Sequence, residues 1–153
     1  MSRTKLAAPI LFAALAALGA PHGADAAAKP PATNLLFSFV TNQAGFDTGI
    51  AIANTTADPF GTTPQDGTCT LTFFGASAPA PFVTPPILAG TVYVNVASSI
   101  APGFQGYVIT ECDFPLAHGF AFVSDLGAQN VAMGSLALVI PPRARKGGER
   151  LDH

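Results

Sequence analysis

The stretches GTCTLTFFG (Gly67–Gly75) and QGYVITEC (Gln105–Cys112) each contain one of the two cysteines of this 153-residue chain. Both are short and rich in Thr, Val, Ile and Phe, a composition typical of β-strands. Side chains alternate between the two faces of a strand, so each cysteine shares a face with fixed neighbours. These are Leu71 and Phe73 beside Cys69, and Val108 and Thr110 beside Cys112. We therefore predict two strands whose inward faces meet in the core.

An isolated pair of cysteines in an exported chain is most simply a disulfide. A Cys69–Cys112 bond would stabilise the fold by roughly 4 kcal/mol on the chain-entropy model. A metal site is the alternative, but the body of the chain offers no further cysteine and only His118 as a histidine. The disulfide is therefore the favoured interpretation.

Five further apolar runs are separated by clusters of Gly, Pro, Asn and Asp, which form turns. They are Leu35–Thr41, Thr48–Asn54, Thr91–Ala97, Gly119–Ser124 and Val131–Ile140. The pattern predicts an all-β fold, namely an antiparallel immunoglobulin-like β-sandwich of about seven strands over residues 35–140. The core Trp typical of immunoglobulin domains is absent, since the chain contains no Trp.

The two ends of the chain differ from this body. Residues 1–28 have a basic start, an apolar run of about 13 residues and a small-residue cleavage site, which together indicate a signal peptide. A membrane span would need roughly 20 apolar residues. Residues 29–34 are predicted to be a linker and residues 141–153 a disordered basic tail. We expect an exported protein (periplasmic, extracellular or on the cell surface) whose mature chain has no transmembrane segment.

The distribution of charge excludes several classes of ligand. Between Pro30 and Pro142 the chain contains no Lys and no Arg. Nucleic-acid binding depends on clustered cations that displace counterions from phosphates, so no nucleic-acid partner is expected. Phosphorylated ligands and anionic sugars lose their usual partners for the same reason.

Catalytic groups are equally sparse. His118 lies near Glu111 and Asp113 in sequence, but no G-x-S-x-G motif accompanies it. Two carboxylates can hydrolyse glycosides, yet the acid of such a pair needs a buried or cation-tuned setting. Glu111 and Asp113 are expected to face solvent on the side away from Cys112. We therefore predict no enzyme activity and no catalytic residues.

Two kinds of binding site remain as alternatives. Calcium is a weak candidate cofactor, because loop carboxylates at Asp58, Asp66, Asp113 and Asp125 could supply oxygen ligands. These aspartates are also ordinary turn formers. A lectin-like module could bind a neutral glycan through the Phe residues of loops, namely Phe46, Phe60, Phe82 and Phe104. The Phe residues within predicted strands are expected in the core: Phe37, Phe39, Phe73, Phe120 and Phe122.

Strand edges give the positive hint of function. Sheet proteins commonly protect their edges with Lys or inward charges, yet no predicted strand carries Lys or Arg, and Val131–Ile140 has no charge at all. Either the Pro-rich connection Gly75–Gly90 covers an edge, or an edge pairs with another subunit or surface protein by β-augmentation. We accordingly expect a structural or adhesive module, and the glycan-binding module is its alternative.

Three segments carry a resemblance that covers most of the mature chain: Phe39–Thr55, Gly67–Gly75 and Pro102–Asp125. They resemble a group of uncharacterised exported bacterial β-proteins. The resemblance implies an exported location and an immunoglobulin-like β-sandwich fold, and it implies no activity.

Overall fold

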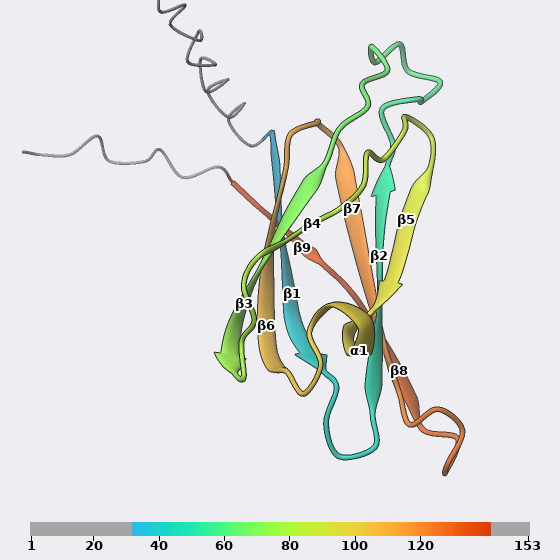
Figure 1. Ribbon diagram of the computed structural model, residues 1–153. Coiled ribbons are helices and arrows are strands. Elements are labelled where there is room, and N and C mark those ends of the chain that lie inside the picture. The colour runs from blue at the N-terminus through green and yellow to red at the C-terminus, as the bar shows by residue number, and fades with distance from the viewer. Residues whose placement is uncertain (1–31, 142–153) are drawn as a thin grey trace, which may run out of the picture.

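Nine strands form two antiparallel sheets in the computed structural model, which describes residues 32–141 (Figure 1). Sheet A, in the order β4-β3-β6-β1-β9, contains β4 (Phe82–Val83), β3 (Cys69–Ala76), β6 (Gln105–Cys112), β1 (Thr33–Thr41) and β9 (Leu138–Ile140). Sheet B, in the order β5-β2-β7-β8, contains β5 (Val92–Val96), β2 (Asp47–Asn54), β7 (Ala117–Ser124) and β8 (Ala132–Leu136). A single helical turn, α1 (Ala97–Ile100), follows β5. The predicted all-β, disulfide-linked sandwich is confirmed.

The strand count differs from the prediction for two local reasons. The expected strand Val131–Ile140 is divided at Ala137, where the chain leaves sheet B as β8 and joins sheet A as β9. The two-residue β4 lies in the Pro-rich connection, where no strand was expected. The predicted linker is also too long, because Thr33 and Asn34 already pair with β6. The predicted signal peptide and all but the first residue of the predicted tail lie outside the described residues.

The disulfide lies inside one sheet. Cys69 and Cys112 face each other directly in the register of β3 and β6, with their Cα atoms 4.0 Å apart. Both are fully buried, and Leu71, Val108 and Thr110 lie on the same inward face, as predicted. The disulfide of antibody domains, by contrast, links the two sheets. Here the bond fixes the β3–β6 register, and the two sheets are held together by packing and by hydrogen bonds such as those between Thr41 and Thr48.

The side of β7 that faces the core is opposite to the side that was predicted to do so. Phe120 and Phe122 point outward and are 41% and 46% exposed, and Phe39 is 40% exposed, so these three are not core residues. The inward positions of β7 hold small side chains, among them Gly119. A Cβ atom built on Gly119 would lie 2.6 Å from Cζ of Phe37, which projects from sheet A. The ring of Phe37 therefore takes the space that larger β7 side chains would need.

We expect Gly119→Ala to destabilise the fold by about 1–3 kcal/mol, because the new methyl group overlaps the Phe37 ring. Urea unfolding of the wild type, Gly119→Ala, Phe37→Leu and the double variant measures this as a double-mutant cycle. The smaller Leu should relieve part of the overlap. The double variant should therefore lose less free energy of unfolding than the sum of the losses in the two single variants. Strictly additive losses would contradict the proposed contact.

Candidate functional site

The four aspartates predicted as weak calcium ligands each fasten a loop. Asp58 accepts hydrogen bonds from the backbone of Phe60 (2.8 Å) and from the hydroxyl of Thr62 (2.6 Å). The Thr62 hydroxyl, with backbone N–H groups of the same turn, lowers the pKa of Asp58 below its usual value. The carboxylate thus holds the tip of the β2–β3 loop in place.

Asp125 does the same at the hairpin between β7 and β8. Its carboxylate accepts hydrogen bonds from the backbone N–H groups of Gly127 (3.0 Å), Gln129 (2.6 Å) and Val131 (3.2 Å). Burial alone would raise the pKa of Asp125, but these N–H donors together lower it. The negative charge is therefore compensated by peptide dipoles.

Asp66 and Asp113 join separate segments. Asp66 accepts a hydrogen bond from the backbone of Ala89 (2.8 Å), and Asp113 accepts one from the backbone of Thr68 (2.8 Å). Within residues 32–141, no group of three His, Cys, Asp or Glu side chains could hold a metal ion. Asp58 and Asp66 share the β2–β3 loop, whereas Asp113 follows β6 and Asp125 follows β7, and each carboxylate has its own hydrogen-bond donors. The structure does not gather the four into one metal site.

The four loop Phe residues do not form a common surface. Phe104 is fully buried and packs edge-on against Phe73 with ring centroids 5.2 Å apart, so it is a core residue and not a contact residue. Phe82 is partly buried and packs against the core. Phe46 precedes β2 and Phe60 follows it, so the length of that strand, roughly 27 Å, separates them. Phe60, at 89% exposure, is the member of the set that reaches furthest into solvent.

The candidate acid–base residues lie on different sheets. His118 is exposed on β7, opposite Ala53 in the register of sheet B. Glu111 is exposed on β6, in sheet A. Asp113 uses its carboxylate to hold Thr68. The outward faces of two packed sheets point in opposite directions, so the sandwich separates His118 from Glu111.

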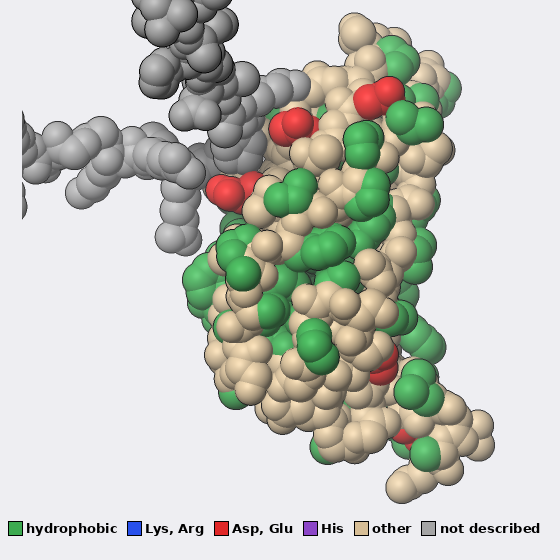
Figure 2. Space-filling model, in the orientation of Figure 1, with side chains coloured by type: hydrophobic (Ala, Val, Ile, Leu, Met, Phe, Trp, Pro, Cys, Tyr) green, Lys and Arg blue, Asp and Glu red, His purple; other side chains and the backbone are tan. Residues whose placement is uncertain are grey.

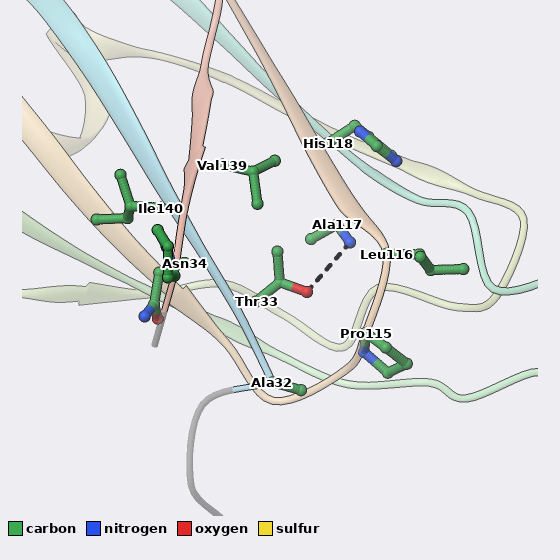
Figure 3. Close-up of a pocket in the computed structure, with 10 residues that line it drawn as sticks. Ala32, Thr33, Asn34, Pro115, Leu116, Ala117, His118, Val139 and Ile140 are labelled. Carbon is green, nitrogen blue, oxygen red and sulfur yellow. Dashed lines mark hydrogen bonds between the residues drawn. The ribbon is translucent and has the colours of Figure 1, made fainter. Parts of the chain in front are cut away.

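A shallow hollow of about 370 Å³ lies where β1, β7 and β9 meet (Figure 3). Thr33, Ala117 and Val139 point toward one another across it, whereas His118 and Leu116 point away. The Thr33 hydroxyl donates to the carbonyl of Phe114 (3.0 Å) and accepts from the backbone N–H of Ala117 (3.4 Å). The hollow is therefore mainly apolar and brings together no acid, base and nucleophile.

Asn54 has a structural role that the sequence did not indicate. Its side chain is 1% exposed, and its Nδ2 donates to the carbonyls of Gln65 (2.8 Å) and Ile87 (3.0 Å). Its Oδ1 accepts from the hydroxyl of Thr56 (2.7 Å). Although Asn54-Thr55-Thr56 matches a glycosylation sequon, the amide is buried in the folded protein and instead joins two loops at one end of the sandwich.

The Pro-rich connection covers one sheet edge. The Thr84 hydroxyl accepts from the backbone N–H of Cys69 (3.0 Å), the Thr84 N–H donates to the Cys69 carbonyl (2.9 Å), and Gly67 bridges to Ile87. Figure 2 shows hydrophobic side chains gathered over the middle of this side of the molecule, with acidic side chains nearer its ends. The outer edge of β3 is thus shielded from Cys69 to Leu71, which supports, for this part of the edge, one of the two alternatives that the sequence left open.

The edge formed by β8 and β9 has a different character. The segment Ala132–Ile140 contains no charged residue, and its large side chains are widely exposed. Met133 is 56% exposed and Leu136 is 77% exposed. Within the described part of the chain, no further strand pairs with the outer side of β8 or of β9. An unprotected, uncharged edge of this kind is a template for pairing with another chain.

The outward faces of the sheets are the surfaces that the sequence reading missed. On sheet A, Phe74 and Tyr107 stack at 5.0 Å with an angle of 8° between their ring planes. Stacked rings cover each other's faces, so this pair is poorly suited to stacking on a sugar. On sheet B, alternate residues of four strands form an apolar outward surface. Asp47, the one carboxylate in these rows, is buried and hydrogen-bonded to Ser98. Large exposed apolar patches of this kind mark sites of interaction with other molecules.

Comparison with known proteins supports the architecture. No protein-family model matches the chain, and no curated protein matches it. Among solved structures, the crystal structure of Thermotoga maritima 1070 is similar over 71% of this chain and 94% of that chain, with a TM-score of 0.51 and 14% sequence identity. At this identity the similarity concerns the fold. Within residues 32–141, the structure contains no helix long and apolar enough to cross a membrane.

The aspartate-fastened loops should loosen in acid. Because the pKa of Asp58 is lower in the folded protein than in the unfolded chain, its contribution is complete above about pH 4 and is lost as the pH falls through the folded-state pKa. Thermal unfolding of the wild type and Asp58→Asn at pH 7 and pH 3 measures the effect. The variant should show a smaller drop in Tm between the two pH values. An equal drop in both proteins would contradict the role assigned to Asp58.

Proposed function

We propose that this protein is an exported, non-catalytic β-sandwich that acts as a structural or adhesive module through its strand edges, sheet faces and loops. The uncharged edge segment Ala132–Ile140 is the observation that carries this proposal. Adding a strand to a sheet edge with exposed apolar side chains costs little desolvation free energy, because no charged group has to leave water. A strand from another copy or another surface protein can extend the sheet there by β-augmentation.

Export is supported by the signal-like N-terminal sequence and by the buried disulfide, which persists in oxidising compartments. The non-catalytic reading is supported by the separation of His118 from Glu111 on opposite sheets and by the use of the aspartates as loop fasteners. Both the resemblance to exported bacterial β-proteins and the small number of charged side chains fit a module that works by contact.

We expect the chain, expressed at full length and recovered from outside the cytoplasm, to form open-ended assemblies visible by electron microscopy at high concentration. Met133→Lys should abolish them, because a charge on the β8 edge opposes strand addition. Leu88→Lys is the matched control, since Leu88 is 55% exposed in the Pro-rich connection and Met133 is 56% exposed. A wild-type protein that stays strictly monomeric at high concentration would refute assembly through this edge.

A second candidate function is glycan binding through a loop aromatic residue. Phe60 is 89% exposed on a turn that Asp58 holds rigid, which presents its ring to solvent. A glycan array probed with the wild type and with Phe60→Ala, each with and without a chelator, tests this function. Binding that is lost in Phe60→Ala would support it. A blank array together with a melting temperature that calcium leaves unchanged would rule it out.

A further inference from the structure

The outward face of sheet B consists of four parallel rows of side chains. The row on β5 is Val92, Val94 and Val96; that on β2 is Gly49, Ala51 and Ala53; that on β7 is His118, Phe120, Phe122 and Ser124; and that on β8 is Ala132, Gly134 and Leu136. We call this set of residues the sheet B face. By register the row on β2 also includes Asp47, opposite Ser124, but this carboxylate is 8% exposed and accepts hydrogen bonds from the backbone N–H and the hydroxyl of Ser98, so the exposed part of the face contains no Asp, Glu, Lys or Arg. The large members of the face are exposed, with Val94 at 67%.

The shape of this surface is determined by the sizes of its side chains. The small residues of β2 form a shallow valley between a Val ridge on β5 and a Phe ridge on β7. The ring of Phe120 leans over β8, where a Cβ atom built on Gly134 would lie 2.6 Å from its Cζ. Because this ring leans toward β8, away from β2, it leaves the valley open beside it.

We propose that the sheet B face binds the same face of a second copy of this chain. A two-fold axis in the plane of contact, running along the strands between β2 and β7, would place the Phe ridge of each copy over the valley of the other. A two-fold contact requires a patch that complements itself, and one ridge next to one valley of similar length meets that requirement. The inference rests on the proposed function in one respect, since both assume that the protein functions by surface contact.

The area of the face is sufficient for a specific contact. Its six large apolar side chains, at their observed exposures, offer about 500 Å² of surface, near the upper range for a patch on a monomer. Two copies would bury about 1,000 Å² in total, the lower bound of a specific interface. Sheets that pack face to face with aligned strands are a stable arrangement, as the sandwich itself shows.

Charge favours a second copy as the occupant. A partner that carried Lys, Arg, Asp or Glu at the contact would have to bury that charge against a face with no counter-charge. A second copy of the sheet B face brings no exposed carboxylate, since Asp47 is buried and hydrogen-bonded to Ser98. The outward face of sheet A is less suited to self-contact, because the exposed Glu111 lies on it and would be buried against apolar neighbours.

Sedimentation velocity of the exported full-length chain over a concentration series tests the proposal. We expect a two-copy species, and Val94→Lys should weaken its association at least about tenfold, since each dimer would bury two lysines. Ala51→Leu, which fills the valley without adding charge, should also weaken it. Val83→Lys is the matched control, because Val83 lies on sheet A and is 56% exposed. Circular dichroism confirms that each variant is folded.

The outcomes separate this inference from the proposed function. A dimer lost in Val94→Lys and Ala51→Leu but retained in Val83→Lys and Met133→Lys supports the sheet B face, even if no open-ended assembly forms. Assemblies that depend on Met133 and are unaffected by Val94→Lys would overturn the sheet B face and leave edge pairing in place. A dimer lost only in Val83→Lys would move the interface to sheet A. A strictly monomeric wild type would overturn the inference.

Discussion

The contact of Phe37 with Gly119 determines which side of sheet B meets the core. The Phe37 ring crosses from sheet A to the backbone of β7, and no side chain fits between them. Because protein interiors are close-packed, the inward row of β7 must be small at this level. Phe120 and Phe122, which alternate with that row, are therefore forced outward. The exposed apolar face of sheet B is thus a consequence of how the core is filled.

The absence of Lys and Arg from the body of the chain determines how the loop carboxylates are stabilised. Between Pro30 and Pro142 no Lys or Arg can neutralise a carboxylate. Asp58 and Asp125 are instead satisfied by hydroxyl and backbone N–H donors within their own turns. Such bonds fix loop geometry locally. Loop acids that would suggest calcium in a sequence are, in this fold, the internal supports of turns.

Local patterns predicted much of this structure, and long-range packing decided the remainder. The strand at Gln105–Cys112, the Cys69–Cys112 pair and their inward neighbours follow from composition and alternation. The orientation of β7 could not be predicted in this way, because both of its alternating rows have an apolar middle and a residue far away in sequence, Phe37, selects between them. The division of Val131–Ile140 likewise depends on Ala137 donating to the Gly119 carbonyl, a tertiary contact.

The edge of β3 is covered by another segment of the chain, whereas in the part of the chain that the structure describes the edges of β8 and β9 are not. Thr84 and the residues around it cap the edge of β3 with two hydrogen bonds to Cys69. A foreign strand at this edge would have to displace β4 and the hydrogen bonds of Thr84. At β8 and β9 the described chain provides neither a covering segment nor a charge, the devices by which monomeric sheet proteins protect an edge. The proposed contact with further protein rests on this difference between a covered edge and a bare edge that lies next to an apolar sheet face.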